Sequence, residues 1–244
     1  MAPETSIGGE NREFPPTRWT VILSAREDPA ARRAALENLL GTVWKPLYFF
    51  ARRKGLNVEA AKDALQEFCV RLLERDVLAG LDPAKGRLRS YLRTAFANFL
   101  VNLHEQRTAL KRGGEARGVS LDFDVAEREA GAAPAEPDAA FEREWAVGVM
   151  ERAHARLRGE FDRGVRAGPL DLFLRYFREG EPPAYAKTAA EQKMSVPQLK
   201  AFLHRTRVRF RELVREEVAP TVEDPGEVEA EIGDLLAVLT GRPS

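Results

Sequence analysis

Three acceptor-bearing side chains, Asp63, Gln66 and Glu67, are spaced i, i+3 and i+4 and have the clearest potential for chemistry in this sequence. On a helix this spacing gathers them into one patch, which suits arginines on a partner protein. Two carboxylates one turn apart also suggest metal binding or acid-base catalysis, but no histidine or glycine-rich loop accompanies them. The three histidines are scattered without the spacing of metal ligands. We therefore expect a protein that is not an enzyme and has no cofactor or metal site; a simple solvated face is the alternative interpretation of the patch.

Basic side chains are the second source of chemistry, and they occur in two blocks although the whole chain has no net charge. Residues 87–117 contain seven arginines and lysines against two acids, and residues 198–215 contain six against one. The compensating acids are concentrated in residues 122–151 and 216–234. Separated blocks of opposite sign predict two nucleic-acid footprints joined and followed by acidic segments.

The sharpest local pattern lies in the second basic block. The sequence predicts a short helix over about residues 184–192, a tight turn at 193–194 and a second helix that starts at Ser195. Ser195 and Gln198 have the spacing of a capping box, and Pro197 lies in the first turn, where it removes only a donor that has no helical partner. This is the layout of a helix-turn-helix motif, whose second helix enters the DNA major groove.

One side of this second helix is expected to pack inward and the other to face DNA. The inward set is Val196, Leu199, Leu203 and Phe210. The outward and flanking set, expected to meet base edges and phosphates, is Gln198, Lys200, Ala201, Phe202, His204, Arg205, Arg207 and Arg209. An ordinary antiparallel helix pair with a solvated arginine face is the alternative.

The elements that position these residues are predicted to be helices throughout, because alternating strand patterns are almost missing. The predicted helices cover residues 19–26, a stretch opening at 28–29, an aromatic segment 46–54 that stops at Gly55, a helix capped by Asn57, a long helix over 88–111, and a short one over 228–239. The fold class is therefore all-α.

A change of composition over residues 116–140, toward alanine, glutamate, glycine and proline, predicts a flexible linker. The chain is then two small helical domains, 14–115 and 141–218, with an acidic C-terminal extension over 219–244. Cys69 is the only cysteine, which fits a reducing compartment. No leader peptide and no apolar run long enough for a bilayer is present, so we expect a cytoplasmic protein with no membrane partner.

The run from Tyr185 to Arg207 resembles region 4 of the extracytoplasmic-function (ECF) sigma factors, whose helix-turn-helix binds the upstream, minus-thirty-five promoter element. Thr188 and Gln192 stand where that family usually has apolar residues, and Lys193 stands in place of the usual turn glycine. The resemblance implies the same two-domain, all-helical fold and a role in transcription initiation.

The N-terminal half resembles the same family. Residues 63–73 are similar to the helix with which sigma factors grip the β′ clamp helices of core RNA polymerase, which implies polymerase-binding roles for Asp63, Gln66, Glu67 and Arg71. Residues 86–112 are similar to the segment that melts and reads the minus-ten element, where aromatic or amide groups hold unpaired bases and cations track the backbone. The positions implied there are Tyr91, Arg93, Asn98, Asn102, Arg107, Lys111 and Arg112.

The resemblance also implies partners and regulation: core RNA polymerase through its β′ clamp helices and β flap, promoter DNA, and an anti-sigma factor or a protein kinase as regulator. Ala60 and Lys62 stand where the family commonly has acids, so we expect conditional binding to core polymerase. We further expect the 228–239 helix to pack on one module and screen a basic face, a solvated extension being the alternative. Two other classes stay open: a stand-alone helix-turn-helix repressor, which would be a dimer on a palindromic site, and an adaptor without DNA affinity.

Overall fold

The computed structural model describes residues 29–74, 87–109, 136–165, 170–176, 184–222 and 224–241. Within these segments the regular structure is entirely helical, which confirms the predicted all-α class. The predicted helix over 19–26 and most of the predicted linker lie outside the described residues.

Helix α2 (Pro29–Arg53) is a single helix of 25 residues that continues through Pro46. The sequence had suggested a separate aromatic segment from residue 46, because proline removes one helical hydrogen bond. Burial offsets that loss: Val43, Leu47 and Tyr48 are each 0% exposed. The helix ends at Arg53, just before the predicted stop at Gly55, whose φ of 93° belongs to the left-handed region.

Helices α3 (Val58–Glu74) and α4 (Leu88–Ala109) pack beside α2. Asn57 caps α3 as predicted, since its Oδ1 accepts the Ala60 N–H at 2.8 Å. Phe68 of α3 contacts Phe96 and Phe99 of α4, with ring centroids 4.9 and 5.5 Å apart. This aromatic cluster fixes α4 against α3 and so decides which face of α4 stays exposed.

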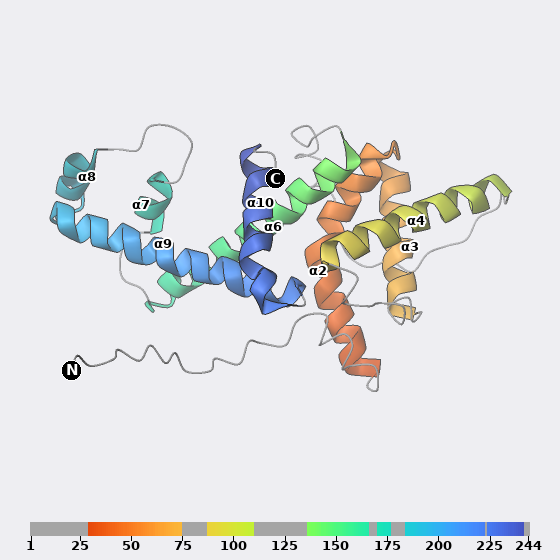
Figure 1. Cartoon of the computed structure of the whole chain (residues 1–244), viewed down its shortest axis with the longest axis horizontal. Coiled ribbons are helices and arrows are strands. Elements are labelled where there is room, and N and C mark those ends of the chain that lie inside the picture. Colours follow the sequence, from red (N-terminus) through yellow and green to blue (C-terminus); the bar gives the residue numbers. More distant parts are fainter. Residues whose placement is uncertain are drawn as a thin grey trace, which may run out of the picture.

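Helix α6 (Pro137–Asp162) begins inside the predicted linker and joins the two halves of the molecule. Figure 1 shows it running from α2 toward α9. It packs on α2, where the Phe141 and Phe50 rings meet edge to face at 6.5 Å, and also on α9. One hydrophobic core therefore continues through both halves, and the division into two domains stays a prediction.

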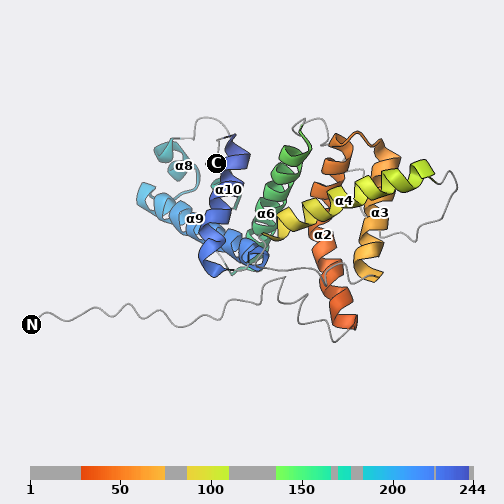
Figure 2. The ribbon, with the colours of Figure 1, turned by 45° about the vertical axis from the view of Figure 1, so that its right-hand side comes forward.

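The remaining elements are α7 (Leu170–Arg175), α8 (Tyr185–Glu191), α9 (Val196–Val218), the 3-10 turns η5 (Ala219–Thr221) and η6 (Pro225–Glu227), and α10 (Val228–Thr240). Figures 1 and 2 both show α8 and the start of α9 at one end of an elongated molecule and the far end of α4 at the other. Between these ends α10 packs on α6 and α9. The two predicted DNA-contacting regions are thus at opposite ends.

Across the described segments, no helix has the combination of length and low polarity that a membrane span requires.

Candidate nucleic-acid interface

Helices α8 and α9 and the turn between them form as predicted, and the turn is held by the predicted capping box. Ser195 Oγ accepts the Gln198 N–H at 3.3 Å, and Gln198 Oε1 accepts the Ser195 N–H at 2.7 Å. Lys193 has a φ of 52°, in the left-handed region that glycine adopts at lowest cost. The turn thus keeps its geometry without glycine, and the backbone strain at Lys193 is one cost of this sequence.

Helix α9 is two-sided over its first three turns. Leu199, Leu203 and Thr206 are at most 4% exposed and hold the helix on the core. The opposite side is exposed, and it carries Gln198, Lys200, Ala201, His204, Arg205 and Arg207. Six of the eight positions predicted to face DNA therefore lie on one solvent-facing side of a helix whose other side is fixed by packing.

Phe202 was predicted to face outward, and that prediction is wrong. It is 7% exposed, and its ring meets the Phe161 ring edge to face at 6.3 Å. Position 202 is only about 60° around the helix from Leu199, so it borders the apolar side. The C-terminal end of α6 covers the Phe202 side chain. Burial of a phenylalanine stabilises a fold by about 1.5–3 kcal/mol.

Arg209, the last position of the predicted interface, is committed to acids of its own chain. Its guanidinium contacts Glu160 of α6 at 2.7 Å, and also Glu212 at 2.9 Å and Glu216 at 3.1 Å. Hydrogen bonding to Glu160 raises the pKa of Arg209 further above its ordinary value. The side chain links α9 to α6 in this structure, whereas Arg205, one turn earlier, is exposed.

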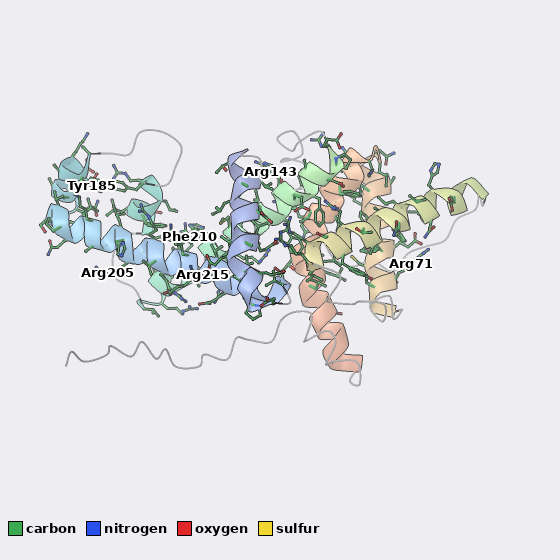
Figure 3. The ribbon with its side chains drawn as sticks, viewed as in Figure 1. Arg71, Arg143, Tyr185, Arg205, Phe210 and Arg215 are labelled. Carbon is green, nitrogen blue, oxygen red and sulfur yellow. The ribbon has the colours of Figure 1, made fainter. Side chains whose placement is uncertain are left out.

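An aromatic pair beside α9 was missed by sequence reasoning. Tyr185 of α8 stacks on Tyr176 with ring centroids 5.3 Å apart, and the Lys200 Nζ lies 5.2 Å from the Tyr185 ring centre. Tyr185 is 42% exposed. Figure 3 shows Tyr185 and Arg205 at the same end of the molecule. The signal in the sequence was the tyrosine at the start of α8, an amphipathic residue at the edge of a basic helix.

The predicted minus-ten face on α4 is partly exposed and partly occupied. Asn98 and Asn102 are exposed, with Val101 between them at 58% exposure. Tyr91 is half-buried, and burial raises its pKa. Arg93 contacts Glu142 of α6 at 3.1 Å, so this cation is engaged within the protein.

The N-terminal turn of α4 holds a cluster of paired charges. Arg89 is 7% exposed and forms ion pairs with Glu142 of α6 and, at 2.7 Å, with Glu231 of α10. Arg87 pairs with Glu231 at 2.7 Å and also with Asp234. The three arginines of the first basic block whose side chains the structure describes, Arg87, Arg89 and Arg93, are thus all paired with acids of α6 or α10.

The predicted polymerase-binding patch lies on α3, away from this cluster. Asp63 is exposed and Gln66 and Glu67 are partly exposed on the same side of the helix. Arg71 pairs with Glu67 at 2.5 Å, and its guanidinium lies 4.9 Å from the Phe99 ring centre. Lys62 pairs with Glu59 at 3.4 Å. Asp63 thus remains an exposed acceptor of the patch, whereas Glu67 is already paired with Arg71 of the same helix.

Three predicted positions cannot be placed. The backbone of Arg107 belongs to the last turn of α4, but its side chain, Lys111 and Arg112 lie outside the described residues. Among the residues that the structure places, no three histidine, cysteine or acidic side chains gather into a possible metal site.

Comparison with known proteins does not add to this picture: no protein-family model matches the chain, and no match is found among curated proteins or solved structures.

Proposed function

We propose that this chain is an RNA polymerase sigma factor of the ECF type, which binds core polymerase and directs promoter recognition, DNA melting and transcription initiation without catalysis of its own. The observation that carries the proposal is the α8–α9 helix-turn-helix, with a capped turn and an exposed polar and basic side at one end of the molecule. The exposed acceptor patch on α3 supports it at the other end.

In this proposal α9 enters the major groove at the upstream element. Gln198 offers the bidentate amide that suits adenine, and Arg205 offers the fork that suits guanine. Lys200, His204 and Arg207 lie on the flanks of the same side, where cations contact phosphates. The Tyr185–Tyr176 pair adds a flat apolar surface beside Lys200.

The α4 face supplies the minus-ten contacts. Asn98 and Asn102 present amide groups at the surface to unpaired bases, while Tyr91 is half-buried on the same helix. Asp63, Gln66 and Glu67 accept hydrogen bonds from arginines of the β′ clamp helices, and the helix-turn-helix end contacts the β flap. Such a protein works in the cytoplasm, where core polymerase and promoter DNA are found.

Binding to core polymerase is conditional in this proposal, because Ala60 and Lys62 make the patch less negative. An anti-sigma factor or a protein kinase would then set the level of activity. Competition binding against an ordinary sigma factor of this type tests it; equal affinity of the unmodified chain would exclude a conditional step.

Run-off transcription with purified core polymerase and genomic fragments tests the function itself. A sigma factor confers initiation at defined start sites, and the Gln198→Ala, Arg205→Ala variant should lose the upstream preference. Absence of defined transcripts, together with no binding to core polymerase, would overturn the proposal.

The pairing of Arg87, Arg89 and Arg93 favours a second candidate, a stand-alone helix-turn-helix regulator that uses α9 alone. Such a regulator is expected to be a dimer on a palindromic site. A sizing column separates the two, because a sigma factor joins core polymerase as a monomer and a dimeric regulator elutes at twice the chain mass without it.

A further inference from the structure

The C-terminal helix α10 contacts arginines of two elements that are far apart in the chain. Glu231, which is 1% exposed, accepts from Arg87 and Arg89 at the start of α4, each at 2.7 Å. Glu229, two residues earlier, pairs with Arg215 near the end of α9. The acidic helix therefore holds the α4 half and the α9 half together through charge, at the middle of the molecule (Figures 1 and 2).

The apolar contact beneath α10 is incomplete. Val228 and Leu235 are buried, but Leu236 is 44% exposed. A groove of about 630 Å³ separates part of α10 from α9, with Phe210, Val214 and Ile232 among its lining residues. Figure 3 shows Phe210 and Arg215 on α9 near this helix. Ile232 and Leu239 also pack against the core, so the ion pairs to α4 and α9 add to an apolar contact that is open on one side.

We propose that α10 is an intramolecular latch, which occupies arginines of α4 and α9 in the closed arrangement and is displaced when DNA phosphates take its place. The inference rests on the proposed function, because Arg87 and Arg89 stand at the start of α4 and Arg215 near the end of α9, the two helices that carry the proposed DNA contacts. It also gives the acidic tail an arginine partner in each of the two basic blocks.

The exchange is physically reasonable because carboxylates and phosphates compete for the same guanidinium geometry. A tethered helix is present at an effective concentration of about millimolar, so it suppresses weak non-specific contacts. A duplex offers a dense row of phosphates and releases counterions on binding, which favours it over two or three carboxylates. The apparent DNA affinity of the closed protein falls in proportion to the fraction that is open.

The first test removes exposed latch charges and leaves the core intact. In the Glu229→Gln, Asp234→Asn variant, both changed side chains are surface-accessible, at 65% and 38% exposure. We expect its affinity for a short mixed-sequence duplex to rise roughly three- to tenfold. The matched control is Glu151→Gln, Asp171→Asn, which removes the same charge from exposed acids outside α10 and should change affinity less than twofold. Equal gains in both variants would overturn the latch, because net charge alone would then account for them.

The second test locks the latch. Arg87→Cys with Asp234→Cys allows a short bis-maleimide crosslink between α4 and α10, and the native Cys69 does not compete because it is buried with a pKa raised to about 12. The crosslinked protein should bind the duplex about tenfold more weakly than the same protein before crosslinking, because its closed state is fixed. Equal affinity before and after crosslinking would overturn the inference.

A third measurement separates failure of the latch from failure of the proposed function. Dyes on Val101→Cys and Thr240→Cys, both at exposed positions, report by energy transfer how far α10 lies from α4 without any DNA. Lower transfer in the Glu229→Gln, Asp234→Asn background, with neither defined transcripts nor binding to core polymerase by any form, would support the latch and overturn the function. Unchanged transfer in that background would overturn the latch whatever the DNA result.

Discussion

The start of α9, at one end of the molecule, and the start of α4, near its middle, both carry basic side chains, but these have different neighbours. At the start of α9, Lys200 and Arg205 project from a helix whose opposite side is buried. At the start of α4, Arg89 is covered by Glu142 and Glu231, which come from α6 and α10. A count of basic residues describes both ends equally well, and only the fold separates exposed cations from cations that hold the structure together.

The largest effect is expected at Phe202, which belongs to the core side of the α9 end. Phe202→Ala should lower the free energy of unfolding by about 3 kcal/mol, because the Phe161 ring loses its contact and a cavity remains. Urea denaturation measures this. His204→Ala, two residues later on the exposed side, should leave stability nearly unchanged. A stable Phe202→Ala protein with weakened DNA binding would restore the outward interpretation.

Substitution of Arg89 tests how much the ion pairs at the start of α4 contribute to stability. Arg89→Ala should cost about 3 kcal/mol of stability, because Glu231 and Glu142 lose a buried partner. Arg93→Ala, one turn later and more exposed, should cost less than about 1 kcal/mol. Thermal and urea unfolding of the two variants compare them directly. Similar small losses would mean that the cluster at the start of α4 does not hold the fold.

DNA binding tests the exposed basic side at the start of α9. Lys200→Ala with Arg205→Ala should weaken duplex binding roughly 10- to 100-fold and reduce the salt dependence of log Kd by about one, for the lost phosphate contact of Lys200. Stability should stay within about 0.5 kcal/mol of the parent protein, since both side chains are exposed. Arg158→Ala, exposed on α6, is the control. An unchanged affinity together with an identical salt slope in the double variant would remove these two residues from the interface.

The start of α9 and the start of α4 also differ in how much of their structure could be predicted from the sequence. The caps at Asn57 and Ser195, the stop at Gly55 and the bounds of α10 follow from residues within one helical turn, so local chemistry was sufficient. Phe202 was misplaced because it lies at the border of the apolar side, where only the position of α6 decides whether it is covered. The six exposed positions on α9 were predictable because its apolar spacing is regular.

The pairing of the α4 arginines could not be predicted in the same way. Arg89 and Glu231 are separated by 142 residues, and the local sequence around either residue does not indicate that the other is its partner. The sequence showed that acids follow each basic block, and the tail helix was expected to screen a basic face. Which arginines it meets depends on α6, whose first turn lies in a segment that composition alone assigned to a linker.

The turn between α8 and α9 allows a smaller test of the open end. Ser195→Ala should lower stability by about 1 kcal/mol, because the Gln198 N–H loses its acceptor. Lys193→Gly should act in the opposite direction, by about 0.5 kcal/mol, since glycine adopts the left-handed φ of 52° with less strain. Opposite signs in urea unfolding would tie the helix-turn-helix geometry to these two residues; a loss in both variants would contradict the left-handed turn.

Cys69 provides the smallest and most local test of the covered half. Burial raises the pKa of its thiol from an ordinary 9.0 to about 12, so the folded protein keeps the thiol protonated at pH 8. A thiol reagent at pH 8 should therefore react slowly with the native chain and rapidly in urea. Because the unfolded thiol ionises first, its contribution to stability is intact below about pH 9 and is lost as the pH rises from there toward 12. Cys69→Ala should flatten that part of the stability curve, and rapid labelling of the native protein would show that the α2–α3–α4 core opens far more readily than its packing implies.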